Sequence, residues 1–131
     1  MTNQELIDLA LKARKNAYAP YSGFCVGAAL LSADGKVFLG ANVENASYSL
    51  TCCAERSALF AAVSSGCRKF EAIAITGGAG DKINDYCPPC GACRQALAEF
   101  SHDGALRVLL YNGKEIKETT LSALLPDSFS L

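Results

Sequence analysis

The first twenty residues carry apolar side chains at helical spacing. The positions that share this stripe are Leu6, Ile7, Leu9, Ala10, Ala13 and Ala17. Residues three and four apart lie on one face of a helix, and Pro20 cannot continue such a pattern. The sequence therefore predicts an amphipathic helix that ends before Pro20.

Two short apolar runs follow, at residues 24–31 and 37–43. Both runs are rich in small and β-branched residues, and the segment between them contains Asp34-Gly35. An Asp-Gly pair between two such runs is a strong signal for a tight turn. We expect a β-hairpin.

The rest of the chain alternates between helical and extended patterns. Strong helix formers run from Cys53 to about residue 64, and residues 70–76 are typical of a buried strand. A polar loop then ends at Pro88-Pro89, before a third predicted helix at 91–100 and a fourth strand at 106–111. This order indicates an α/β sandwich with a mixed sheet and right-handed crossovers, in a single domain over residues 1–131. The two later helices then start at the same edge of the sheet.

The composition excludes several classes of partner. Half of the 131 residues are hydrophobic, which is enough for one buried core. The formal net charge is -1 without any run of Lys or Arg, which argues against nucleic-acid binding and favours a small neutral partner. No apolar stretch is long enough to span a bilayer, and the first residues do not resemble an export signal. We expect a soluble, cytoplasmic protein with no membrane partner.

The seven cysteines are expected to be reduced. Their number is odd, and a core of this size does not need disulfides. His102 is the one histidine, so a transition-metal site would be built mostly from thiolates. Such a donor set suits zinc or an iron–sulfur cluster.

The strongest chemical signal is Cys53-Ala54-Glu55, followed a strand and a loop later by Cys90 and Cys93. Cysteines three apart at a helix start can reach one ion, and helix amino termini lower thiol pKa values. Three ligands leave one position on zinc open for water. A carboxylate beside that position, here Glu55, can move the protons of a hydrolytic reaction.

Three thiolates carry more negative charge than a divalent cation balances. Arg56 and Arg94 each follow a ligand closely and are candidates to offset the excess. We expect Arg56 to support the ligands in this way.

Two other interpretations of the cysteines stay open. Cys87 would make a fourth ligand, which closes the site and gives a structural zinc module for protein interactions. Cys87-Pro-Pro-Cys90 also has redox spacing, although in thioredoxin-like folds that motif follows the first strand. The remaining cysteines have no partner at ligand spacing and are expected to be small core or surface residues. They are Cys25, Cys52 and Cys67.

Over essentially its whole length the sequence resembles the short, homotetrameric class of cytidine deaminases. Five blocks carry the resemblance in order: PYSGFCVGAAL from Pro20, GANVENASY from Gly40, CCAERSALF from Cys52, PCGACRQALAEF from Pro89 and LLPDSF from Leu124. The zinc deaminases share a His or Cys before x-Glu and a later Pro-Cys-x-x-Cys. The resemblance implies a three-layer α/β/α fold and zinc-dependent hydrolysis of cytidine and 2'-deoxycytidine to their uridine counterparts and ammonia, in pyrimidine salvage.

The resemblance also implies roles for individual residues. One zinc per subunit would be held by Cys53, Cys90 and Cys93, with Glu55 as general acid and base. The free pyrimidine nucleoside would be bound by the Ala54 backbone, by Phe24 stacking on the base, and by Asn42 and Glu44 at the ribose. Ala46, Tyr48 and Phe129 would reach a neighbouring subunit's pocket in the homotetramer.

Some of these residues have simpler interpretations when they are considered alone. Asn42-Val43-Glu44 is typical of a polar strand end, although the alternation puts both polar side chains on one face, and Phe24 is typical of a core aromatic. One departure from the family is Cys87-Pro88, where relatives often have Ser or Thr immediately before Pro-Cys. Another aminated heterocycle is opposed as substrate by Asn42 and Glu44, and a cytosine in RNA or DNA by the weak basic charge.

Overall fold

The first helix forms where the sequence supplies both a cap and an apolar stripe. In the computed structural model, which describes residues 1–131, helix α1 spans Asn3–Arg14. The Thr2 hydroxyl accepts a hydrogen bond from the Glu5 backbone at 3.1 Å, and the Glu5 carboxylate accepts one from the Thr2 backbone at 2.7 Å. This reciprocal pair is a capping box, which satisfies backbone donors that would otherwise lack partners.

A five-stranded mixed sheet forms the centre of the molecule, in the order β2-β1-β3-β4-β5. Its strands are β1 (Phe24–Ser32), β2 (Val37–Ala41), β3 (Phe70–Ala79), β4 (Arg107–Tyr111) and β5 (Ile116–Thr120). The hairpin β1–β2 is antiparallel, β1 also pairs antiparallel with β3, and β3 and β4 are parallel. The predicted hairpin and mixed sheet are confirmed.

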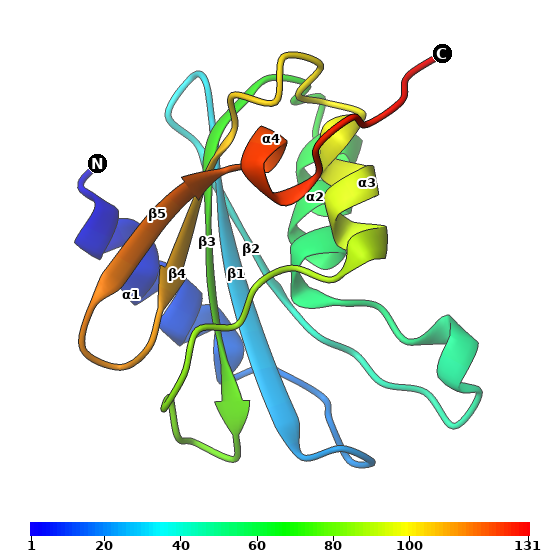
Figure 1. The fold of residues 1–131 in the computed structure, drawn as a ribbon. Helices are drawn as coiled ribbons and strands as arrows, with labels where there is room; N and C mark the ends of the chain where they lie inside the picture. Colours follow the sequence, from blue (N-terminus) through cyan, green and yellow to red (C-terminus); the bar gives the residue numbers. More distant parts are fainter.

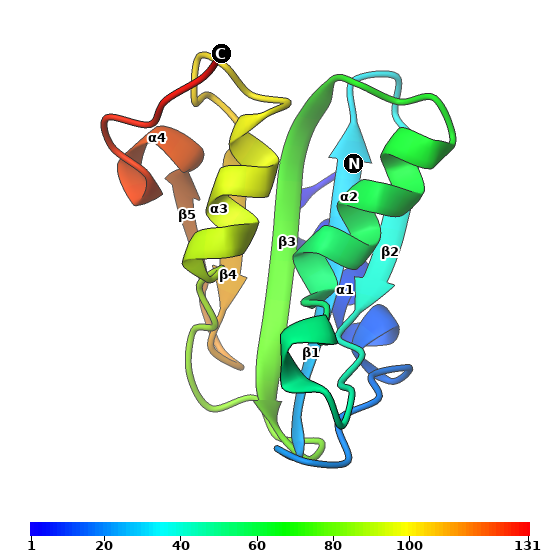
Figure 2. The ribbon, with the colours of Figure 1, turned by 90° about the vertical axis from the view of Figure 1, so that its right-hand side faces the viewer.

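Helices cover both faces of this sheet. Helix α1 lies on one face, while α2 (Ala54–Ser64) and α3 (Gly91–Ala98) lie side by side on the other (Figures 1 and 2). Figure 2 also shows that α2 and α3 begin at the same end of the molecule. The three-layer α/β/α class expected from the sequence is confirmed. None of the helices combines the length and hydropathy needed to cross a membrane.

The core consists of two clusters, one on each side of the sheet. Successive residues of β3 belong to one cluster and then the other: Ile73 and Ile75 face α2 and α3, whereas Ala72 and Ala74 face α1. A strand that is buried on both faces has no polar side to show, which explains its continuous apolar sequence.

The first turn of α2 packs directly on β2. A Cβ atom at Gly40 would lie 2.4 Å from both the Ala54 carbonyl oxygen and the Ala58 nitrogen, so only glycine permits this approach. The close packing fixes the position of the residues at the start of α2.

Several boundaries differ from the sequence-based expectation. Strand β3 continues past Thr76 to Ala79, because its last residues pair with the start of β1. Strand β2 ends at Ala41, and α3 ends at Ala98. The short helices η1 (Tyr48–Leu50) and α4 (Leu121–Leu124) and the edge strand β5 were not predicted, because they are short and largely polar or exposed.

Candidate metal centre and active site

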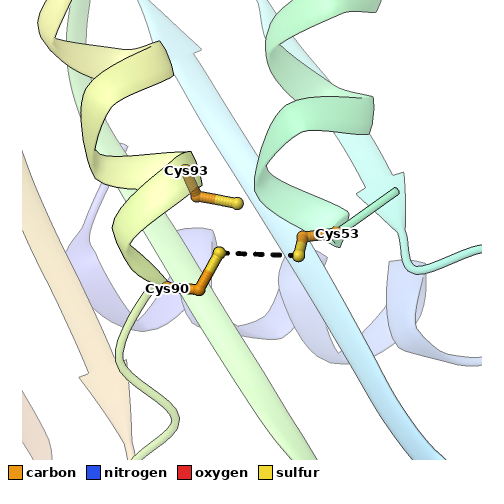
Figure 3. A group of neighbouring side chains, drawn as sticks. All are labelled: Cys53, Cys90 and Cys93. Carbon is orange, nitrogen blue, oxygen red and sulfur yellow. Dashed lines mark hydrogen bonds between the residues drawn. The ribbon is translucent and has the colours of Figure 1, made fainter. Parts of the chain in front are cut away.

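Three cysteine side chains converge at the amino termini of α2 and α3. Cys53 caps α2, Cys90 caps α3, and Cys93 lies in the first turn of α3 (Figure 3). Their sulfur atoms all lie within 4.8 Å of one another, and the Cys53 and Cys90 sulfurs are 3.7 Å apart. Neither capping cysteine uses its thiol to cap the helix. The thiols are therefore free to bind an ion.

The donor set and its spacing fit zinc. Zinc–thiolate bonds of about 2.3 Å in tetrahedral geometry place two sulfurs roughly 3.8 Å apart. Of the three residues, Cys93 is buried, Cys53 is half-buried and Cys90 is exposed, so the cluster opens to solvent on one side. Three thiolates and an open side are the pattern of a catalytic zinc site rather than a closed structural one.

Cys87 is not part of this cluster. Its sulfur packs against Gly77 of β3, where an added Cβ would lie 2.7 Å from it. Burial raises the pKa of the Cys87 thiol to about 11. A buried thiol that stays protonated and lies outside the cluster is poorly suited to be a fourth zinc ligand or a reactive redox cysteine, so the structure argues against both alternatives.

The two candidate arginines have different surroundings. The Arg56 guanidinium donates to the Cys53 sulfur at 3.4 Å. Arg94 instead donates to the backbone carbonyls of Pro89 at 2.8 Å and Leu124 at 2.7 Å. Hydrogen bonds from Cys93 and from Arg56 lower the pKa of the Cys53 thiol to about 5. Arg56 is thus the cation placed to balance the thiolates.

Glu55 is the second residue of α2 and only 4% exposed. Burial, with a smaller contribution from the negative charge on Cys53, raises the pKa of its carboxyl to about 7. A carboxyl with such a pKa can both accept and donate a proton near neutrality. Ala54, between Cys53 and Glu55, is completely buried.

Asn42 and Glu44 continue the chain beyond β2 and are both buried, at 8% and 7% exposure, whereas Val43 between them is 49% exposed. The Asn42 side chain donates to the Phe24 carbonyl at 2.8 Å and accepts from the Val26 backbone at 2.9 Å. These two residues are therefore built into the fold and do not form a solvated strand end.

The Glu44 carboxylate holds the segment that leads into β1. It accepts hydrogen bonds from the backbone of Tyr21 at 3.0 Å and of Ser22 at 3.1 Å, and one from the Ser22 hydroxyl. The Ser22 hydroxyl is the main cause of a lowered Glu44 pKa. Ser22 was not among the predicted site residues, although it lies within one of the family-like blocks.

Phe24 opens β1, and its ring lies on the face of the sheet that carries α2 and α3. An added Cβ at Gly77 would be 3.2 Å from this ring, and the ring side chain is 41% exposed. Phe24 is thus an accessible aromatic at the edge of the site and does not belong to the core.

Ala46, Tyr48 and Phe129 do not join the site within one chain. All three are exposed; Tyr48 contacts the Tyr21 ring edge-on, with ring centroids 6.0 Å apart. Phe129 is 70% exposed. It belongs to the tail that follows α4, which ends at the end of the molecule opposite the starts of α2 and α3 (Figure 2).

Comparison with known proteins gives a consistent result. The chain matches the cytidine and deoxycytidylate deaminase zinc-binding region over residues 1–108. The cytidine deaminase of Sporosarcina psychrophila is 50% identical over 131 residues, covering 99% of this chain and 93% of that one. The cytidine deaminase of Halalkalibacterium halodurans is 51% identical over 131 residues, covering 99% and 96%.

Solved structures agree with these relatives. The crystal structure of cytidine deaminase from Burkholderia pseudomallei has a TM-score of 0.90 at 50% identity and covers 98% of this chain and 100% of that chain. The enzyme from Mycobacterium tuberculosis has a TM-score of 0.83 at 38% identity, with all of both chains covered.

The α/β fold places three cysteines at two neighbouring helix starts, with a buried glutamate beside them. These features are those of a hydrolytic zinc enzyme. The chain belongs to the cytidine and deoxycytidylate deaminase family. The resemblance, the enzyme class and the zinc cofactor expected from the sequence are thereby confirmed.

Proposed function

We propose that this enzyme hydrolyses the exocyclic amine of free cytidine and 2'-deoxycytidine, giving uridine or 2'-deoxyuridine and ammonia. The observation that carries the proposal is the cluster of Cys53, Cys90 and Cys93 with the buried Glu55 beside it. The relatives named cytidine deaminase over the full chain length support the choice of substrate.

Cys53, Cys90 and Cys93 would hold one zinc ion per subunit, and Arg56 would balance part of their charge. Zinc in such a site supplies a Lewis acid that lowers the pKa of a water to about 7, which provides a nucleophile near neutrality. The protein keeps the ligands at the starts of two helices, where the helix dipoles favour the thiolate form.

Glu55 would carry out both proton transfers of the reaction. Deamination requires a proton on the ring nitrogen of cytosine and, later, a proton on the leaving amine. A carboxyl whose pKa is raised to about 7 by burial is suited to accept and return protons in turn. The backbone of Ala54 would hold the pyrimidine ring next to Glu55.

The remaining contacts would select a nucleoside. Phe24 would stack on the base, because its ring is exposed at the edge of the site. Asn42 uses one amide hydrogen and one lone pair inside the chain, so a second hydrogen and a second lone pair are left for a ribose hydroxyl. Glu44 would accept from the other hydroxyl. The role in pyrimidine salvage, which the resemblance implies, and the cytoplasmic location, which the sequence composition suggests, stay predictions.

Absorbance during incubation with four compounds tests this proposal: cytidine, 2'-deoxycytidine, the free base cytosine and a short cytosine-containing oligonucleotide. We expect the cytidine band to be lost with both nucleosides, and at least about a hundredfold lower kcat/KM with cytosine, since unpaired Asn42 and Glu44 would cost about 3 kcal/mol. Preferred turnover of the oligonucleotide would contradict a free-nucleoside enzyme. Bound zinc without turnover of any compound would favour another aminated heterocycle, and after that a structural zinc module.

We further propose a homotetramer whose subunits complete one another's sites. Large apolar side chains lie exposed on the segments near the site, on α2 and in the tail: Tyr21, Val43, Tyr48, Leu50, Phe60 and Phe129. Exposed apolar side chains that lie together often mark an interface. Contact between copies of the chain would bury these side chains. Ala46, Tyr48 and Phe129 would then reach the pocket of a neighbour.

Light scattering should give a mass four times that of the 13.8 kDa chain. The Phe129→Ala variant should fold normally, because its ring is 70% exposed in one chain. Its KM for cytidine should nevertheless rise by roughly tenfold, since a buried aromatic contact is worth about 1.4 kcal/mol or more. A fully active monomer, or an unchanged KM for Phe129→Ala, would disprove the shared site.

A further inference from the structure

Arg14, the last residue of α1, is a buried cation with no carboxylate partner. It is 8% exposed, and neither of the two ion pairs in the chain involves it. Its Nε donates to the Cys25 carbonyl at 2.8 Å. The two hydrogens of its Nη2 are shared among three further carbonyls: Gly78 at 2.8 Å, Gly80 at 2.6 Å and Lys82 at 3.0 Å. Because burying a guanidinium is costly, these charge-assisted bonds must hold their acceptors firmly.

The four carbonyls belong to two segments that border the candidate nucleoside site. Cys25 follows Phe24 in β1, and Gly78 to Lys82 form the end of β3 and the turn after it. Figures 1 and 2 show this turn beside the segment that enters β1, at one end of the sheet. An added Cβ at Gly78 would lie 1.9 Å from the Lys82 carbonyl oxygen, so the turn folds back tightly on the strand around the guanidinium.

The turn held by Arg14 is connected to the residues proposed to bind the nucleoside. The Gly80 backbone donates to the Gly23 carbonyl at 2.9 Å. Next to Gly23, Ser22 is hydrogen-bonded to the Glu44 carboxylate, and Phe24 follows on the other side. Hydrogen bonds together with the short backbone segment 22–24 thus link Arg14 to both Phe24 and Glu44.

We propose that Arg14 is a positioning residue for nucleoside binding. It holds the turn at residues 78–82 against the segment 22–25, and so fixes the base-stacking ring of Phe24 and the ribose-facing carboxylate of Glu44. This role rests on the proposed function. Arg14 makes no hydrogen bond to the segments that carry the zinc ligands and Glu55, which start α2 and α3 on the other face of the sheet. Its loss therefore weakens substrate binding and leaves the metal and the proton transfers intact.

The test is steady-state kinetics of Arg14→Met with cytidine, with zinc content and thermal unfolding measured on the same samples. Methionine keeps an apolar, unbranched stem in the buried position, lacks the guanidinium end and so removes all four hydrogen bonds. We expect KM to rise by roughly tenfold and kcat to change by less than about threefold, the signature of lost uniform binding. About one zinc per chain should be retained. Arg14→Lys, which keeps the charge but not the planar fork, should recover part of the KM.

A matched control is Arg68→Met. Arg68 also donates to two backbone carbonyls, Val63 at 2.7 Å and Cys67 at 3.1 Å, but it lies beyond the far end of α2. Its KM and kcat should equal those of the wild type. If Arg68→Met raised KM as much as Arg14→Met, the effect would be general and the assignment of Arg14 would be wrong.

The outcomes separate the two proposals. Absence of turnover by the wild type would overturn the proposed function and this role with it. Wild-type turnover with an unchanged KM in folded, zinc-loaded Arg14→Met would overturn the role of Arg14 alone, as would loss of zinc from that variant. If Arg14→Met does not fold, Arg14→Lys decides: a raised KM at full zinc content supports the role, and a wild-type KM contradicts it.

Discussion

Glu55→Gln should bind zinc and fold as the wild type does, yet lose deamination of cytidine by about four orders of magnitude in kcat. Glutamine matches glutamate in shape, so the buried space at the start of α2 stays filled. The amide can neither accept nor release a proton at neutral pH, and both proton transfers of the proposed reaction would lack their carrier. We expect a loss of kcat at the upper end of the usual range for general acid–base catalysis, because one group serves two proton transfers.

Zinc quantification and absorbance kinetics on the same samples check this prediction. Glu71→Gln is the matched control, because Glu71 is an exposed carboxylate on β3 and should keep full activity. A Glu55→Gln variant with more than about a tenth of wild-type kcat would show that another group carries the protons. Loss of zinc from Glu55→Gln would instead show that Glu55 supports the metal site.

The cluster of three cysteines was predictable because its sequence signal is local. Cys90 and Cys93 are separated by one helical turn, and helix-forming residues follow both Cys53 and Cys90. Alternating strands and helices then place two consecutive helix starts at one end of a sheet, so the convergence of the cysteines follows from topology. The same reasoning gave the hairpin and the mixed sheet, since their apolar patterns are unambiguous.

Other parts of the site depend on contacts that no local pattern contains. Asn42 and Glu44 are held in buried positions by hydrogen bonds to segments about twenty residues earlier. The sequence Asn42-Val43-Glu44 alone does not predict this burial. Cys87 has ligand spacing from Cys90, yet the loop turns its thiol toward Gly77. Arg14 is typical of a basic residue in the last turn of a helix, and its buried position becomes visible only when the end of β3 is in place.

Strand β5 was missed for a different reason. Strand β5 has the sequence IKETT and is an edge strand, with its charged residues exposed. Charged residues on an edge strand prevent pairing with other chains, and they also hide the strand from an analysis based on hydrophobicity.

Cys90→Ala should abolish both zinc binding and activity, whereas Cys87→Ala should keep both. The contrast follows from the positions of the two thiols: Cys90 lies in the cluster, 3.7 Å from Cys53, and Cys87 lies outside it. With one ligand removed, Cys53 and Cys93 offer only two sulfurs, too few for a tight site. Cys52→Ala is a second control, since Cys52 adjoins Cys53 in sequence but faces Ser57 at 3.7 Å.

Loss of zinc should also lower stability without unfolding the chain. The two apolar clusters on either side of the sheet do not include the proposed metal ligands Cys53, Cys90 and Cys93, so the fold has its own core. Zinc at a thousand times its dissociation constant stabilises the native state by about 4 kcal/mol, which corresponds to roughly 10–15 °C in melting temperature for a chain of this length. Calorimetry of the zinc-loaded wild type and of Cys90→Ala measures the difference, and added zinc should leave the melting temperature of Cys90→Ala unchanged. If Cys87→Ala lost zinc and melted like Cys90→Ala, the metal would be bound by four cysteines in a closed structural site, and the proposed catalytic centre would be wrong.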